Sequence, residues 1–127
     1  MSLRVGVVGT GALGFHHARL LRPMPAIEFV GIYDTNPARA AEVARRLETV
    51  DHPSLEALLE RVDAVTVAVP TTAHAAVGMA VLERDIALLM EKPLADTVAA
   101  ADQLVRRAGD RGVVLQVGHV EDRKSVV

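Results

Sequence analysis

Short apolar runs alternate with amphipathic stretches along the whole chain. Runs with the length and composition of buried strands lie at residues 3–8, 27–33, 64–69, 86–90 and 113–117. A sixth and shorter candidate covers only residues 48–50. Between the runs, apolar residues recur at helical spacing, which predicts helices over residues 12–21, 37–47, 55–62, about 72–83 and about 97–111.

Strands that alternate with helices form parallel sheets with right-handed crossovers. Six such strands predict an α/β fold, a doubly wound parallel sheet of the Rossmann type in the order 3-2-1-4-5-6. Ligands bind such a sheet beyond the carboxyl ends of its strands, where the order reverses between strands 1 and 4. The candidates for a site are therefore the residues that follow predicted strands, namely Gly9–Gly14, Asp34, Pro70–His74, Glu91–Pro93 and Gly118–His119.

The first strand runs into Gly9-Thr10-Gly11-Ala12-Leu13-Gly14, which fits the pattern G-x-G-x-x-G. The first glycine of that pattern permits a tight turn, the second lets a pyrophosphate approach the backbone, and the third lets the helix pack close to the sheet. The pyrophosphate would lie against the unpaired N–H groups at the start of the helix. Glycine-rich turns are common, so the prediction of a dinucleotide site depends on the strand that precedes the motif and the helix that follows it.

Asp34 ends the second strand and lies 20 residues after Gly14, where the motif places an acid for the adenosine ribose hydroxyls. The alternative is a turn or cap residue before Thr35-Asn36-Pro37. A carboxylate here would repel a 2′-phosphate, and Arg39 is the only base nearby. The sequence therefore favours NAD over NADP as the cofactor.

Composition narrows the class of protein. The chain has 127 residues, 50% of them hydrophobic, which predicts one folded domain. Aromatic residues make up 2% and the net charge is -2, so neither base stacking nor a basic surface indicates nucleic-acid binding. There is no cysteine, no signal peptide and no apolar run of membrane-spanning length, so we expect a cytoplasmic protein. The five histidines follow no metal-binding pattern, and we expect no metal.

Four segments together carry a resemblance to a known family. They are GVVGTGALG at 6–14, VAVPTTAH at 67–74, MEKPLA at 90–95 and VLQVGHVE at 114–121. In these segments the chain resembles the cofactor domain of the glucose-fructose oxidoreductase / inositol dehydrogenase family (Gfo/Idh/MocA). The resemblance implies oxidation or reduction of a sugar, polyol or nucleotide-sugar carbon with NAD or NADP. It covers nearly the whole chain.

The resemblance also implies roles for single residues. Lys92 would be the catalytic base at the nicotinamide, and Glu91 would hold the nicotinamide ribose or pair with Lys92. His74 would lie near the cofactor or only pack, and Thr71 would bind the cofactor, cap a helix or do both. His17 is interpreted as a structural histidine that braces the first helix. The residues expected to bind the cofactor are Gly9, Thr10, Gly11, Ala12, Leu13, Gly14, Asp34, Pro70, Thr71, His74, Glu91, Lys92 and Pro93.

The chain departs from the family after Glu121. Family members continue into a second, α+β half that recognises the substrate, whereas residues 122–127 read DRKSVV. We therefore expect a dinucleotide-binding domain over residues 1–120 with a tail at 121–127, from a truncated oxidoreductase that binds cofactor with little turnover. The alternative is a non-catalytic nucleotide-binding or partner-binding module. A homo-oligomer formed through the edge strand at 113–117 is a further hypothesis.

Overall fold

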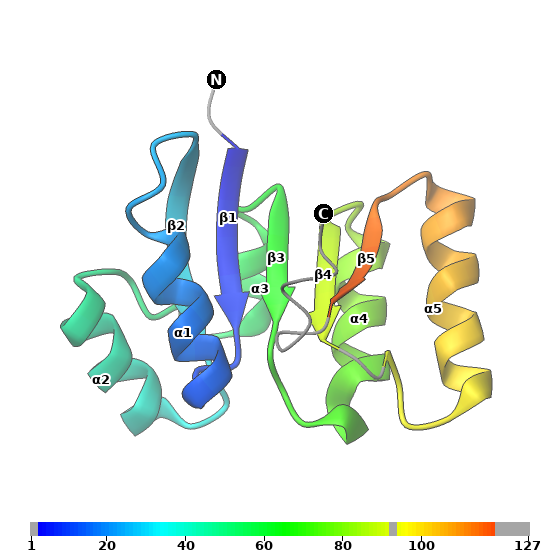
Figure 1. The fold of residues 1–127 in the computed structure, drawn as a ribbon, viewed down its shortest axis with the longest axis horizontal. Coiled ribbons are helices and arrows are strands. Elements are labelled where there is room, and N and C mark those ends of the chain that lie inside the picture. The colour runs from blue at the N-terminus through cyan, green and yellow to red at the C-terminus, as the bar shows by residue number, and fades with distance from the viewer. Residues whose placement is uncertain (1–2, 92–93, 119–127) are drawn as a thin grey trace.

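The computed structural model describes residues 3–91 and 94–118, apart from the side chains of Ala12 and Leu13. Its centre is a parallel sheet of five strands in the order β2-β1-β3-β4-β5 (Figure 1). The strands are β1 (Leu3–Val8), β2 (Ile27–Tyr33), β3 (Ala64–Val67), β4 (Ala87–Glu91) and β5 (Leu115–Gly118). The predicted α/β class and the doubly wound parallel sheet are confirmed.

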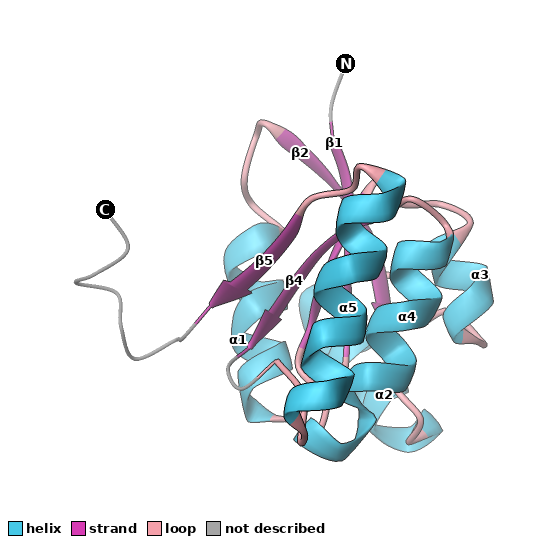
Figure 2. Cartoon of the chain, turned by 90° about the vertical axis from the view of Figure 1, so that its right-hand side faces the viewer, coloured by secondary structure: helices cyan, strands magenta, loops and turns pink. Residues whose placement is uncertain are grey.

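Helices cover both faces of the sheet (Figures 1 and 2). On one face lie α1 (Ala12–Leu21) and α2 (Pro37–Leu47). On the other lie α3 (Leu55–Leu59), α4 (His74–Glu83) and α5 (Val98–Arg111), and the short 3₁₀ turn η1 (Thr71–Ala73) leads into α4. Side-chain caps start three of these helices, because Asn36, Ser54 and Thr97 accept hydrogen bonds from backbone N–H groups in the first turn.

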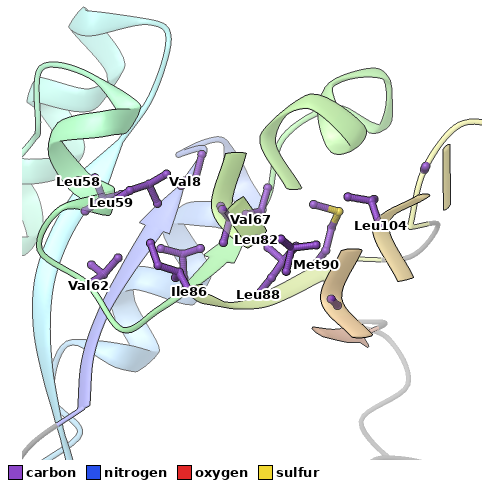
Figure 3. Packing of buried hydrophobic residues seen from close by; sticks show 14 residues of the cluster. Val8, Leu58, Leu59, Val62, Val67, Leu82, Ile86, Leu88, Met90 and Leu104 are labelled. Carbon is purple, nitrogen blue, oxygen red and sulfur yellow. The ribbon is translucent and has the colours of Figure 1, made fainter. Parts of the chain in front are cut away.

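Each face of the sheet has its own apolar core. The larger core joins β3 and β4 to α3, α4 and α5, and Figure 3 shows Val67, Leu88 and Met90 of the strands against Leu82 and Leu104 of the helices. The smaller core includes Val7 and Ile32, which pack against α1 and α2. The buried members of both cores are aliphatic apart from Met90, and the aromatic residues Phe15, Phe29 and Tyr33 pack against the cores while partly exposed.

The predicted third strand at residues 48–50 is wrong as a strand. Its place beside β2 is taken by one parallel bridge between Ile32 and Asp51. The Ile32 N–H donates to Val50 O at 2.9 Å, and the His52 N–H donates to Ile32 O at 2.9 Å. The ladder ends there because the chain turns into α3, whose N-cap is Ser54. In the described part of the chain the sheet therefore has five strands instead of six, and their order is the predicted one without its outermost strand.

Other boundaries differ by a few residues. The run at 64–69 forms a strand only as far as Val67, and α3 ends at Leu59. The last two strands, β4 and β5, each start later than predicted and end one residue later. The last residue of β4 is therefore Glu91, which lies at the edge of the sheet where ligands are expected.

One irregularity interrupts β2. Val5 pairs with Phe29, but the next residue, Gly6, pairs with Gly31, so Val30 is an extra residue on the β2 side. Phe29 packs on the side of α1 and α2, whereas Val30 packs on the opposite side. Gly31 has φ +144°, and a Cβ there would lie 2.4 Å from Val50 O, so the position needs glycine.

Candidate functional site

A cleft of about 550 Å³ lies at the carboxyl edge of the sheet, where the strand order reverses between β1 and β3. It is the edge at which the arrowheads of the strands end in Figure 1. Residues from four predicted groups line it: the glycine motif, Asp34, the chain after β3 and Glu91. The lining residues are Val8, Gly9, Thr10, Gly11, Tyr33, Asp34, Thr35, Asn36, Arg39, Leu55, Ala68, Val69, Pro70, Ala73, Val77 and Glu91.

Two positions at the bend after β1 need glycine because a side chain there would overlap backbone atoms. Gly9 has φ +92°, and a Cβ there would lie 2.4 Å from Ala68 O. A Cβ on Gly14 would lie 1.7 Å from Gly9 O, because α1 passes so close to the bend. Gly11 is different, since the nearest atom to a Cβ added at that position would be Arg39 Nη1, 4.0 Å away. The backbone at Gly11 is therefore open to a ligand.

The start of α1 has the features of an anion site. Gly11 is its N-cap and supplies no side-chain hydrogen bond, and the first turn carries no acidic residue. The first N–H groups of the helix therefore have no partner within α1, and the positive end of the helix dipole faces the cleft. The absence of a Cβ at Gly11 lets an anion reach them. A pyrophosphate fits this combination.

Asp34 is turned toward the glycine bend. Its Oδ2 accepts hydrogen bonds from the Thr10 N–H and from Thr10 Oγ1, both at 2.7 Å, and its Oδ1 accepts from the Asn36 N–H at 2.8 Å. Burial alone would raise the pKa of Asp34, but the hydrogen bonds from Asn36 and Thr10, with the charge of Arg39, outweigh burial and lower it. The carboxylate is therefore charged at neutral pH and is held at the rim of the cleft.

The chain after β3 forms the facing wall. Val69, Pro70 and Ala73 line the cleft, while Thr71 lies in η1 outside the lining. His74 is 2% exposed, and its ring nitrogens lie 3.0 Å from Val69 O and 3.2 Å from Leu94 O. The ring therefore joins the chain after β3 to the chain after β4. The cofactor contacts expected of Thr71 and His74 stay predictions.

Glu91 lines the other end of the cleft and has a partner that the sequence did not reveal. His17 Nε2 of α1 lies 3.5 Å from Glu91 Oε2, and His17 Nδ1 lies 3.2 Å from Thr66 Oγ1 of β3. Burial lowers the pKa of His17, although Glu91 acts in the opposite direction and His16 in the same one. His17 does brace α1 against the sheet, and it also touches a residue that lines the cleft.

Some predicted site residues lie outside the described part of the chain. Lys92, Pro93 and His119 fall beyond residues 3–91 and 94–118, so their predicted roles stay predictions. Within those ranges no three His, Cys, Asp or Glu side chains are grouped to hold a metal ion. No described helix is long and apolar enough to cross a membrane.

Sequence reasoning missed a second hollow beside the first. It measures about 370 Å³, and Thr10, Gly11 and Arg39 line it as well as the main cleft. Phe15 and Arg46 also line it, and the guanidinium of Arg46 lies 4.7 Å from the centre of the Phe15 ring. The sequence alone does not reveal this cation–π contact, because it depends on how α1 and α2 pack together.

Residues 3–119 match the family described as "Oxidoreductase family, NAD-binding Rossmann fold", Gfo/Idh/MocA. The chain belongs to this family. The match includes the glycine bend, Asp34 and the chain that follows β3 and β4, so the cleft lies in the NAD-binding domain of a Gfo/Idh/MocA protein. The resemblance and the NAD cofactor predicted from sequence are confirmed at this level.

Several family members are similar over this region. The chain is 39% identical to UDP-N-acetylglucosamine 3-dehydrogenase of Acidithiobacillus ferrooxidans over 94% of its own length and 37% of the relative's. A crystal structure of that enzyme matches with a TM-score of 0.91 and 37% identity, over 97% of this chain and 40% of the other. Inositol 2-dehydrogenase of Rubrobacter xylanophilus is 36% identical over 91% of this chain and 35% of the relative.

A further structure, GenD2 from gentamicin A biosynthesis, was solved in complex with NAD. It matches with a TM-score of 0.86 and 32% identity, over 92% of this chain and 34% of that one. The chain therefore spans little more than a third of the relatives that it matches.

Proposed function

We propose that the cleft binds NAD(H) across the ends of β1, β2, β3 and β4. The observation that carries the proposal is the meeting of three features in one cleft: the bare start of α1, the open backbone at Gly11 and the charged Asp34. The first two features suit the pyrophosphate of a dinucleotide, and the third suits its adenosine ribose. Glu91 then belongs to the nicotinamide end, as its place at the end of β4 suggests.

Asp34 is proposed to hold the adenosine ribose and to select NAD. Three protein donors already fix its carboxylate, which can still accept hydrogen bonds from ribose hydroxyls at its remaining lone pairs. Its negative charge would repel a 2′-phosphate. Arg39 lines the same cleft and is a cation with which a 2′-phosphate could pair. The preference for NAD over NADP therefore depends on the negative charge of Asp34.

We propose that the whole enzyme to which this domain belongs oxidises or reduces a sugar, polyol or nucleotide-sugar alcohol. By their names, two of the relatives above act on a nucleotide sugar and on inositol, both rich in hydroxyl groups. NAD, when bound, supplies the hydride acceptor. Lys92, next in the chain after Glu91, is proposed to take the proton of the substrate hydroxyl. This chain by itself is expected to bind cofactor with little or no turnover, because the relatives extend far beyond it.

Titration with NADH, followed by the change in nicotinamide fluorescence, tests the proposal. We expect a dissociation constant between about 1 μM and 1 mM, competition by ADP, and binding of NADPH at least about fivefold weaker. The control variant is Asp63→Asn, which alters a carboxylate bound to Arg4 near the start of β1, at the edge of the sheet opposite the cleft. Folded protein that binds no NADH at about 1 mM would overturn the proposal.

A further inference from the structure

Three polar side chains from three different elements meet beside the cleft. His17 comes from α1, Thr66 from β3 and Glu91 from β4. The side chains of His17 and Glu91 are only 13% and 15% exposed, and Thr66 is 8% exposed. Glu91 lines the cleft, whereas His17 and Thr66 do not. The group therefore stands directly behind one residue of the proposed binding surface.

The contacts of His17 favour one tautomer of its neutral ring. A neutral imidazole has one N–H and one acceptor nitrogen. If the Thr66 hydroxyl donates to Nδ1 at 3.2 Å, the proton is on Nε2, which faces Glu91 Oε2 at 3.5 Å. The opposite tautomer would turn a lone pair toward a carboxylate and is disfavoured. The lowered pKa of His17 agrees with a neutral ring at neutral pH.

This arrangement links the two ends of the cleft. The helix whose first turn faces the pyrophosphate also carries His17, which reaches the last residue of β4. We propose that His17 is a positioning residue that orients the Glu91 carboxylate toward the nicotinamide half of the bound cofactor. The inference depends on the proposed function, because it assigns a role within the same NAD site. A histidine that only braces α1 would affect stability without distinguishing one half of the ligand from the other.

Variants that keep or remove one ring nitrogen at a time separate these roles. The amide nitrogen of Gln reaches approximately the place of Nε2, whereas Asn reaches only the place of Nδ1. We expect His17→Asn to weaken NADH binding about fivefold while ADP binding changes by less than about twofold. His17→Gln should restore most of the NADH affinity. His16→Gln, on the same helix but outside the cleft lining, is the matched control and should change neither.

A double-mutant cycle tests whether His17 acts through Glu91. Glu91→Gln should weaken NADH binding, and adding His17→Asn to it should weaken binding no further. Fully additive effects would overturn the inference. Thr66→Val removes the hydroxyl with little change in shape, and we expect a smaller loss of NADH affinity in the same direction. That variant keeps the test available if the His17 variants fold poorly in thermal unfolding.

The outcomes separate the two proposals. If the unaltered chain binds no NADH, the proposed function fails, and this inference fails with it. If it binds NADH but His17→Asn weakens NADH and ADP equally, or weakens neither, only the positioning role is overturned. Selective loss of NADH affinity, with rescue by Gln, supports it.

Discussion

At one end of the cleft, around the start of α1, the groups that face the ligand are backbone groups held in place by glycine, with the Asp34 side chain beside them. At the other end, near β4, the group that faces the ligand is the Glu91 side chain, which contacts His17. The first end allows almost no alternative packing, because a Cβ on Gly9 or Gly14 would overlap backbone atoms. The second end depends on side chains that can change rotamer or protonation state.

The backbone groups near the start of α1 are fixed in geometry, whereas the side chains near β4 can change orientation and charge. A backbone cradle binds a pyrophosphate that every dinucleotide shares, so little is gained by adjusting it. The nicotinamide half is where chemistry occurs, and side chains there can orient the ligand and change charge. Substitutions of the glycines should therefore cause loss of folding, whereas substitutions of the side chains near β4 should cause loss of selective affinity.

The largest effect is expected from Gly14→Ala. The added Cβ would lie 1.7 Å from Gly9 O, so either α1 or the bend must move. We expect a loss of about 3 kcal/mol in the free energy of unfolding, measured by urea denaturation, and loss of binding of both NADH and ADP. Gly109→Ala in α5 is the matched control, since nothing lies within 4 Å of its added Cβ. It should stabilise the domain by up to about 1 kcal/mol. Equal stability of the two variants would contradict the packing argument.

Asp34→Asn should have the next largest effect. The variant loses the negative charge and one acceptor oxygen, and the donors from Thr10 and Asn36 are left partly unmatched. We expect NADH and ADP to bind about tenfold more weakly, with NADPH affected less, so that the preference for NADH narrows. Fluorescence titration with each ligand measures this. An unchanged ratio of NADH to NADPH affinity would show that Asp34 does not select the cofactor.

The smallest effect concerns pH and the His17 end of the cleft. Burial lowers the pKa of His17 in the folded chain. Below about pH 6.5, His17 therefore binds a proton more readily in the unfolded chain than in the folded chain. This contribution to stability is present at neutral pH and is lost as the pH falls from about 6.5 through the lower folded pKa. His17→Gln should therefore lose less stability than the unaltered chain between about pH 7 and pH 5. Urea unfolding at both pH values measures the difference, and equal losses would count against a buried neutral His17.

The end of the cleft near β1 was predictable because its determinants are local. Glycine spacing, the preceding strand and an acid at the end of the next strand are all visible in sequence, and the structure brings Gly9, Gly11 and Asp34 together. The contact of Thr10 with Asp34 was not predicted, because the motif leaves its second position unspecified. The His17–Thr66–Glu91 group was missed for a stronger reason. It depends on the register between β3 and β4 and on the placement of α1 over them.

The fold was predictable wherever the apolar pattern was long. Strands β1 and β2 and helices α1 and α2 have the predicted bounds. Gly9 follows β1, Gly11 caps α1, and α2 begins at Pro37 after the cap residue Asn36. The six-strand prediction failed at residues 48–50, because the chain beside β2 forms a single bridge at Asp51 before it turns into α3. Pattern alone could not decide this, because a single bridge and a short strand require the same few apolar residues.

The extra residue in β2 has a consequence for which insertions and deletions the protein can survive. Phe29 and Ile32 both point toward α1 and α2, although an uninterrupted strand would send residues three apart to opposite sides. Removing Val30 would place Phe29 next to Gly31 in a regular strand, and both halves of β2 would keep their present sides. The side chains of Phe29 and Ile32 would still point toward α1 and α2, and only the Val30 side chain would be lost from the opposite core. The inserted residue thus lies between two halves of β2 that already agree in phase, and a frame-preserving deletion of its codon should be better tolerated than deletion of any other codon in the strand.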